Sequence, residues 1–203
     1  MILIGRNASP FVRRVAISLH LLDLPFEQKE ISTIHQRDEI LKYNPLGRVP
    51  ALVLDDGEVL IDSTPILDHL DQSVGSERAL VPSGGAARRQ VLKLVAFAMG
   101  AMEKAVLCFF ERNIRPVDKR HQELLDKFAD QALAGLAQLE GRAGEGWLFG
   151  SQPTQADISA VAALGFLQFS WAERIPPGLF PKLEALSDRA HALSAFADTK
   201  PKP

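Results

Sequence analysis

The residues best suited to bind a small ligand lie within residues 43–70. Val49-Pro50 ends a loop there, and a cis bond before the proline, which costs only about 0.5–1 kcal/mol, would turn the amide and carbonyl of Val49 outward. Ser63 stands where a helix N-cap is expected, after Asp62, and the unsatisfied amides of a helix start suit a carboxylate. This layout predicts a site for a short peptide with a free carboxylate. A hairpin that merely leads into a capped helix is the alternative.

Two strands and a hairpin are expected to join these two groups. Asp56-Gly57 separates the apolar runs 51–54 and 58–61. An Asp-Gly pair between such runs indicates a tight hairpin, because the turn needs a positive φ that glycine adopts without steric cost. Pro50 cannot donate to a sheet ladder, so it belongs at the start of the first strand or in the loop before it.

Upstream of this stretch the pattern predicts a strand, a helix, a second strand and a short helix. Ser9-Pro10 is typical of a helix start, with serine at the N-cap and proline at the first helical position. The expected elements are a strand at 1–5, a helix from 11 to about 22, a strand at 26–31 and a short helix at 35–42. With the hairpin and its helix, this order gives a small mixed sheet with helices on its faces, which is the thioredoxin-like order.

The second half of the chain is predicted to be all helical. Residues 73–87 are rich in Ser, Gly and Ala, which is typical of an interdomain linker. Helices are expected at 88–112, 119 to about 142, 154–169 and 179 to about 193. We therefore expect an α/β thioredoxin-like N-terminal domain at 1–75, a linker at 76–87 and an all-α C-terminal helical domain at 88–203.

Composition and charge limit the kinds of partner, cofactor and location that we expect for this protein. The 203 residues are 24% charged with a net charge of −2, which gives no electrostatic footprint for nucleic acid. A single cysteine excludes an intramolecular disulfide framework, and the five histidines lack the spacing of metal ligands. No apolar run reaches the roughly 18 residues that a membrane span needs, and no positively charged leader opens the chain. We expect a cytoplasmic protein without a metal, a nucleic-acid partner or a membrane anchor.

Four motifs together make the chain resemble the glutathione transferase family, and bacterial and serine-type members most of all. Their order and spacing cover most of the sequence. They are Ser9-Pro10-Phe11-Val12-Arg13-Arg14-Val15 at the first helix, Asn44-Pro45-Leu46-Gly47-Arg48-Val49-Pro50 before the third strand, Asp62-Ser63 at the third helix, and the capping box Thr154-Gln155-Ala156-Asp157.

The resemblance implies that glutathione is the co-substrate and that its parts have separate binding residues. Val49 would pair through its backbone with the cysteinyl part, with Pro50 cis. Ser63 would take the γ-glutamyl carboxylate, and Asp62 the ammonium group. These roles agree with the backbone edge and the anion site expected from the residues themselves.

The glycyl carboxylate of glutathione would face basic residues. Arg48 is the first candidate, and His35 or Lys42 in the preceding segment are the others. A purely solvated Arg48 is the alternative. The resemblance also implies a homodimer, with Leu46 and the third helix as candidates for the contact.

The chemistry implied by the resemblance is attack by the glutathione thiolate on a small hydrophobic electrophile. An unperturbed thiol has a pKa of about 8.5, so only a few per cent is ionised at neutral pH. Lowering this pKa by about two requires about 2.7 kcal/mol. A hydroxyl that donates to the anion supplies roughly 1.5–3 kcal/mol, and the helix start adds about 0.3–1 kcal/mol. Ser9 is that hydroxyl in the serine-type classes, Asn7 is the rival donor, and capping of the first helix is the alternative role for Ser9.

Other functions remain open at this point. A protein of the same fold could hold glutathione or a protein partner without turnover, or could use glutathione for isomerisation or peroxide reduction. The sequence Asn7-Ala8 before Ser9 differs from the Ser-Ser-Cys pattern of glutathione-dependent isomerases, which disfavours that class. Thiol transfer through a protein cysteine is also disfavoured, because the one cysteine, Cys108, lies in an apolar part of the second half and is expected to be buried.

Overall fold

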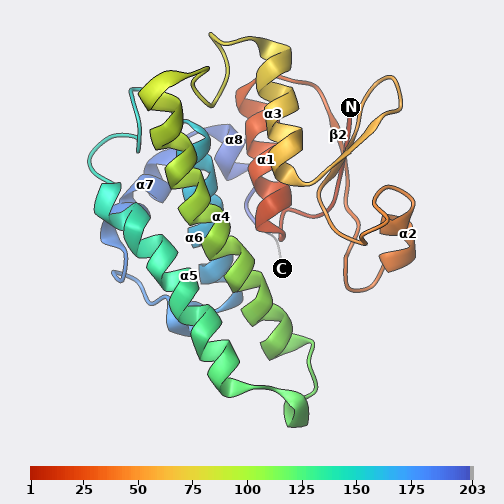
Figure 1. Cartoon of the computed structure of the whole chain (residues 1–203), viewed down its shortest axis with the longest axis vertical. Helices are drawn as coiled ribbons and strands as arrows, with labels where there is room; N and C mark the ends of the chain where they lie inside the picture. Colours follow the sequence, from red (N-terminus) through yellow and green to blue (C-terminus); the bar gives the residue numbers. More distant parts are fainter. Residues whose placement is uncertain (202–203) are drawn as a thin grey trace. The chain divides into compact units, whose positions relative to one another are not determined.

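The structure, a computed structural model, describes residues 1–201. By their internal contacts these residues divide into two compact units (Figure 1). The sheet unit consists of residues 1–83 and the described residues from 191 onward, and the helical unit consists of residues 84–190. The predicted domain bounds at 1–75, 76–87 and 88–203 stay a prediction about separate folding.

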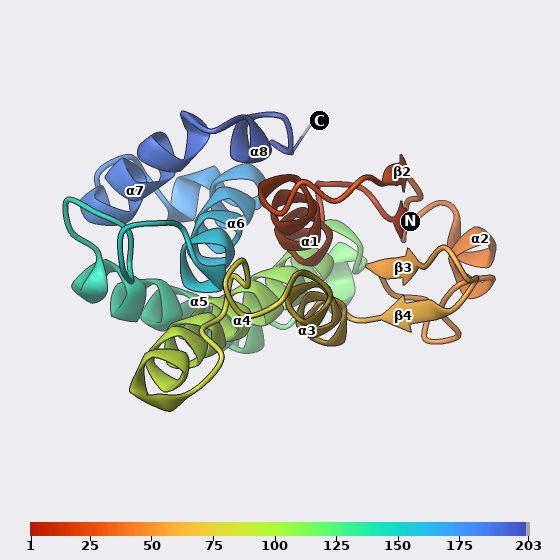
Figure 2. The ribbon, with the colours of Figure 1, turned by 90° about the horizontal axis from the view of Figure 1, so that it is seen from above.

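The sheet unit is built on four short strands in the order β2-β1-β3-β4. β1 pairs in parallel with β2 and antiparallel with β3, and β3 and β4 form the hairpin expected around Gly57. Helices α1 and α3 lie on one face of this sheet and α2 on the other (Figure 2). The strands are β1 (Ile2–Ile4), β2 (Glu27–Lys29), β3 (Ala51–Val53) and β4 (Val59–Ile61).

The sheet unit also contains four helices. A short final helix, which the sequence pattern did not predict, contacts α1. Beside it, a guanidinium nitrogen of the buried Arg13 lies 2.9 Å from Nε2 of His191. The C-terminal segment is thereby held against the first helix. The helices are α1 (Pro10–Leu21), α2 (Arg37–Leu41), α3 (Ser63–Val74) and α8 (Ser194–Ala197).

The helical unit packs α4 against both α5 and α6. Helix α6 is buried around almost its whole circumference, as its run of alanine and large apolar residues predicts. Its elements are α4 (Gly85–Asn113), the 3₁₀ turn η1 (Val117–Lys119), α5 (Gln122–Arg142), α6 (Gln155–Ser170), the 3₁₀ turn η2 (Ala172–Arg174) and α7 (Pro181–His191), whose last residue belongs to the sheet unit.

The expected architecture is confirmed: a small mixed sheet with thioredoxin-like order is followed by helices alone. Element bounds differ from the expected ones by a few residues. The segment at 73–87, expected to be a linker, is shorter in the structure, because α3 runs to Val74 and α4 already begins at Gly85. Glycine at 84 and 85 did not prevent the helix from starting there, since helix starts tolerate glycine.

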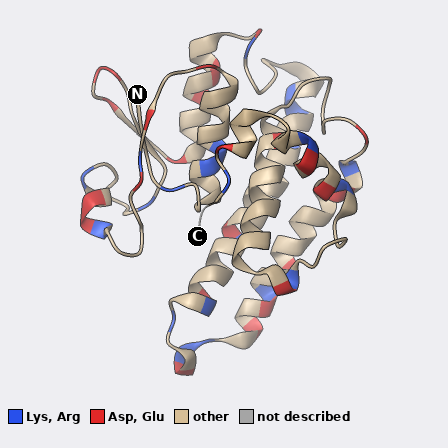
Figure 3. Cartoon of the chain, turned by 180° about the vertical axis from the view of Figure 1, so that it is seen from behind, with Lys and Arg blue, Asp and Glu red and all other residues tan. Residues whose placement is uncertain are grey.

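Charged residues are mixed in sign over the surface. Figure 3 shows acidic and basic residues side by side on α2 and along the far ends of α4 and α5. Among the described residues, no helix combines the length and the apolar character that a membrane crossing requires.

The capping box at the start of α6 is present as the sequence predicts, and it also fastens the preceding loop. Asp157 is 0% exposed. One of its carboxylate oxygens accepts from the amide of Leu148 at 2.6 Å, and the other accepts from the amide and the hydroxyl of Thr154 at 2.8 and 2.9 Å. Asp157 therefore joins a remote loop to the helix start in the core of the helical unit.

We expect Asp157→Ala to destabilise the protein by about 2–4 kcal/mol, because the buried amide of Leu148 and the partly buried amide of Thr154 lose the acceptor that Asp157 provides, at about 1–3 kcal/mol for a fully buried group. For a chain of this size the thermal midpoint should fall by roughly 5–10 °C, measured by circular dichroism. Thr154→Ser keeps the capping hydroxyl and should stay within about 2 °C of the wild type. An unchanged midpoint for Asp157→Ala would show that the helix start is not held by this carboxylate.

Candidate functional site

The loop that precedes β3 is organised by one buried amide side chain. Asn44 is 2% exposed. Its Nδ2 donates to the carbonyl of Arg48 at 2.9 Å, and its Oδ1 accepts from the amide of Leu46 at 3.0 Å. Both ends of the loop are tied to one side chain, so the backbone that follows has a fixed starting point. The sequence contained Asn44 in a motif but gave no sign of this role.

At the end of this loop the Val49-Pro50 bond is cis, as the resemblance implied. Among the described residues, the amide and carbonyl of Val49 make no hydrogen bond to the protein. The next carbonyl, that of Pro50, accepts from the amide of Asp62 at 3.3 Å. The two halves of the predicted site, at Val49 and at the start of α3, are therefore neighbours, and the backbone edge at Val49 is available to a ligand.

The N-cap of α3 is Asp62, which corrects the prediction that Ser63 occupies that position. The carboxylate of Asp62 accepts from the amide of Thr64 at 3.0 Å, and its φ of +68° lies in the region that non-glycine residues rarely adopt. Asp62 is the cap because it is the last residue before α3 whose backbone is not helical, whereas the backbone of Ser63 is already helical. Ser63 is the first residue within the helix, and its amide has no partner among the described residues.

A buried guanidinium lies behind this helix start. Arg14, on α1, is 2% exposed and donates to the hydroxyl oxygen of Ser63 at 3.4 Å. Burial lowers the pKa of Arg14 to about 10, while the nearby Asp62 carboxylate raises it, so the side chain stays charged at neutral pH. A fixed positive charge and the start of a helix thus act on the same point, which favours an anion there. No pattern in the sequence indicated a role for Arg14.

Ser9 has the first of its two predicted roles in the structure, the capping of a helix. It is the N-cap of α1, where its Oγ accepts from the amide of Val12 at 3.4 Å. The hydroxyl hydrogen has no acceptor among the described residues, and the side chain is half-buried. Because a hydroxyl has both acceptor and donor capacity, Ser9 can cap the helix and still donate to an anion.

Asn7, the rival donor, is also held by the protein through its oxygen. Nε2 of Gln28, on β2, lies 2.9 Å from Oδ1 of Asn7 and 2.9 Å from the carbonyl of Gly5. Nothing in the sequence pointed to Gln28, because a polar residue on a short edge strand is usually only solvated.

The absence of a side chain at Gly5 allows the start of α1 and the loop before β3 to lie close to the end of β1. Its φ is +126°, and a Cβ atom there would lie 2.6 Å from Cγ2 of Val12 and 3.0 Å from Cβ of Val49. Only glycine permits the first helix and the loop before β3 to approach the end of β1 so closely. Ser9, Val49 and Asn7 therefore belong to one neighbourhood.

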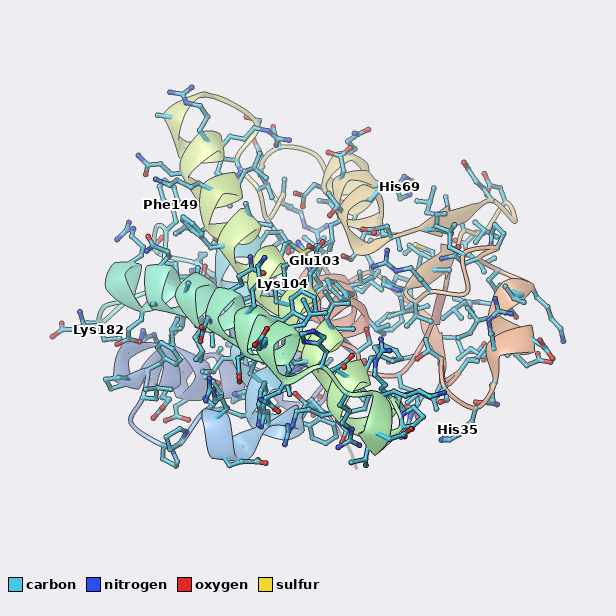
Figure 4. All side chains as sticks on the ribbon, turned by 60° about the horizontal axis from the view of Figure 1, so that its bottom comes forward. His35, His69, Glu103, Lys104, Phe149 and Lys182 are labelled. Atoms are coloured by element: carbon cyan, nitrogen blue, oxygen red, sulfur yellow. The ribbon has the colours of Figure 1, made fainter. Side chains whose placement is uncertain are left out.

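The basic residues proposed for the glycyl carboxylate are exposed. Arg48 follows the loop and lies next to Val49. His35 projects from the outer end of the segment between β2 and α2 (Figure 4). Lys42 forms an ion pair with Glu39 at 2.6 Å, so its ammonium group already has a partner. Among the described residues, no hydrogen bond or ion pair joins His35 or Lys42 to Val49, and their role toward the glycyl carboxylate stays a prediction.

Cys108, the single cysteine, behaves as expected of a core residue. Cys108 is 2% exposed, and burial raises the pKa of its thiol to about 11, so it stays protonated and unreactive at neutral pH. Within residues 1–201, no cluster of His, Cys, Asp and Glu could hold a metal ion.

Two protein-family models match the chain. The model described as glutathione S-transferase, N-terminal domain, matches residues 3–78, and the model described as glutathione S-transferase, C-terminal domain, matches residues 122–189. The chain is also similar to the maleylacetoacetate isomerase of Pseudomonas aeruginosa, with 30% identity over 97% of this chain and 92% of that protein. It is 29% identical to the uncharacterised GST-like protein YibF of Escherichia coli over 99% of this chain and 98% of that protein.

Two solved structures illustrate the similarity in three dimensions. A glutathione transferase family member from Pseudomonas fluorescens Pf-5, crystallised with bound glutathione, gives a TM-score of 0.86 and 32% identity and covers 100% of this chain and 99% of its own. A glutathione S-transferase from Methylobacterium radiotolerans, in complex with glutathione sulfonate, gives a TM-score of 0.92 and 29% identity and covers 100% and 95%.

We expect Gly5→Ala to destabilise the protein by about 2–4 kcal/mol, because it adds a clash with Val12 and Val49 to the cost of a positive φ. Gly57→Ala is the matched control: its φ is +90°, but an added Cβ has no atom within 4 Å. It should cost only about 1–2 kcal/mol. Denaturant unfolding of both variants measures the difference. Equal losses would mean that the close approach at Gly5 contributes nothing.

Proposed function

The chain belongs to the glutathione S-transferase family, and from this premise we propose that it binds glutathione and conjugates its thiolate to small hydrophobic electrophiles. The observation that carries the proposal is the hydroxyl of Ser9. Its oxygen caps α1, while its hydrogen has no acceptor among the described residues. This donor stands at the positive end of a helix, in the neighbourhood of an unpaired backbone edge.

The cysteinyl part of glutathione would pair with the backbone of Val49. An amide and a carbonyl without protein partners suit an extended peptide, which can bond to both as an added strand would. Asn44 and the Asp62 contact to Pro50 hold this edge in place before the ligand arrives. A preformed edge reduces the ordering cost of binding.

The γ-glutamyl end would lie at the start of α3. The amide and hydroxyl of Ser63 would donate to the carboxylate, with the charge of Arg14 behind them. Ser63 is 1% exposed, so the carboxylate would reach only its edge. The exposed carboxylate of Asp62 would face the ammonium group, and Arg48, with His35 as second candidate, would face the glycyl carboxylate.

In the reaction the sulfur attacks an electrophilic carbon, a C–S bond forms, and the leaving group departs or the electrons move into an acceptor. The enzyme accelerates this step by keeping the thiol ionised. A donated hydroxyl hydrogen bond stabilises the thiolate by roughly 1.5–3 kcal/mol, which is of the size needed to ionise most of a bound thiol at neutral pH. Ser9 fills this role with Asn7 as a second donor.

A glutathione-dependent isomerase is the second candidate, and the 30% identity to a maleylacetoacetate isomerase favours it. Against it stands the sequence Asn7-Ala8-Ser9 at the start of α1. A peroxidase and a member that binds glutathione without turnover share the same binding residues. Product analysis with a maleyl diketo acid, a peroxide and a panel of aryl halides, epoxides and enones separates these activities.

We expect Ser9→Ala to lower kcat for conjugation roughly 10- to 100-fold while the Kd for glutathione stays within about twofold, because the lost hydrogen bond acts on the thiolate. Single-turnover rates and calorimetric titration measure the two quantities. Ser9→Thr retains the hydroxyl and the cap and should keep most of the activity.

A wild-type protein that binds glutathione but converts no substrate of the panel would replace the transferase with a binding protein. Full activity in Ser9→Ala would instead assign the thiolate to another donor, for which Asn7→Ala is the next variant.

We further propose that the chain forms a homodimer that uses Leu46, whose side chain is 67% exposed. Leu46→Glu should convert a dimer into a monomer at micromolar concentration, because a carboxylate would be desolvated in the contact. Val117→Glu is the control at another exposed apolar residue, 76% exposed on η1, and should leave the dimer intact. Sedimentation velocity distinguishes the states, and a monomeric wild type would contradict the proposal.

A further inference from the structure

Gln28 links the edge strand of the sheet to the segment that leads into α1. Its Nε2 lies 2.9 Å from the carbonyl oxygen of Gly5 and 2.9 Å from Oδ1 of Asn7. Gln28 is the register partner of Leu3 in the parallel pair β1–β2, so its side chain lies on the face that Leu3 and Gly5 share. One side-chain amide thus reaches across the end of β1.

The backbone carbonyl of Gly5 determines how both amides are oriented. A carbonyl can only accept, so the atom of Gln28 that faces it must be the NH₂ group. The same nitrogen faces Asn7, and a donor there requires an acceptor, so Asn7 must present its oxygen. The orientation of the Asn7 carboxamide therefore follows from an anchor that cannot be reversed.

The consequence is that the two N–H donors of Asn7 point away from β2. Among the described residues they make no hydrogen bond to the protein, and the side chain is only half-buried. Asn7 is two residues before Ser9, whose hydroxyl hydrogen also has no acceptor among the described residues. Two donor groups from one short loop, the carboxamide NH₂ of Asn7 and the hydroxyl of Ser9, are left for a ligand, while the oxygens of both side chains are used by the protein.

We propose that Gln28 is a positioning residue for the thiolate: it holds the Asn7 carboxamide so that its N–H donors, together with the Ser9 hydroxyl, face the sulfur of bound glutathione. This inference rests on the proposed function. Without Gln28 the carboxamide can rotate, and the lone pairs of Oδ1 would then face the sulfur and repel the anion. Gln28 acts through Asn7 and does not itself touch the ligand.

The test compares the thiolate fraction of bound glutathione over pH, from its ultraviolet absorbance, in the wild type and in Gln28→Met. Methionine has a similar length and cannot donate. We expect the ionisation constant of the bound thiol to fall about tenfold or more, which corresponds to losing one hydrogen bond to a charged group. The rise of kcat/KM for the electrophile with pH, at saturating glutathione, should move to higher pH by the corresponding amount, about one pH unit or more.

A double-mutant cycle separates positioning from a general structural effect. In an Asn7→Ala background, Gln28→Met should cause no further loss of thiolate, because there is no carboxamide left to orient. Gln28→Lys retains a donor toward both oxygens and should retain the thiolate, which keeps the test decisive if Gln28→Met folds poorly. Glu27→Gln, on the same strand and exposed, is the matched control and should leave the profile unchanged.

The outcomes distinguish this inference from the function on which it rests. Suppose that the wild type binds glutathione as a thiolate. If Gln28→Met then has the same pH profile as the wild type, the role of Gln28 is refuted and the transferase stands. The same conclusion follows if Gln28→Met lowers the thiolate fraction as much in the Asn7→Ala background as in the wild type. If wild-type protein binds no glutathione in calorimetry, both are refuted. Protection of the Asn7 side-chain N–H groups from solvent exchange on glutathione binding, lost in Gln28→Met, supports the proposed contact.

Discussion

The close approach of the backbone at Gly5 is the constraint on which the site depends. The amide of Gly5 donates to the carbonyl of Lys29 at 3.0 Å, and its carbonyl accepts from Gln28. The missing Cβ leaves room for Val12 on one side and Val49 on the other. A strand, a helix and a loop that are far apart in the sequence meet at this residue, and any side chain there would push them apart.

Three polar side chains of the site are held by the protein through their oxygen atoms. Ser9 accepts from Val12, Asn7 accepts from Gln28, and Ser63 accepts from Arg14. In each case the protein uses the oxygen as an acceptor, and the hydrogens of the same group have no acceptor among the described residues. Three groups that could equally accept or donate are thereby left with donor capacity, and an anionic ligand at the proposed site would find them oriented in advance.

The start of α3 shows how one acidic residue can free a neighbour for binding. Because Asp62 takes the N-cap with a positive φ, Ser63 moves into the first turn, and its amide and hydroxyl are not used to cap the helix. The charge of Arg14 offsets the carboxylate of Asp62 nearby. The strained backbone of Asp62 is tolerated where the amide of the same residue is bonded to Pro50.

The sequence by itself determined the order of strands and helices, the hairpin at Gly57, the capping box at Thr154 and Asp157, and the family, because these depend on local periodicity, turn chemistry and motif spacing. It also named Ser9, Asn7, Val49, Asp62 and Ser63. Only the tertiary structure decided that Asp62 rather than Ser63 caps α3, that Arg14 lies behind Ser63, and that Gln28 orients Asn7. The physical reason for the last two is that their hydrogen bonds join residues 49 and 21 positions apart. The cap at Asp62 is local, but it comes with a contact from the amide of Asp62 to the carbonyl of Pro50 on another element. The packing of β1, β2 and α1 around Gly5 determines which residues become partners, and no local pattern in the sequence predicts this packing.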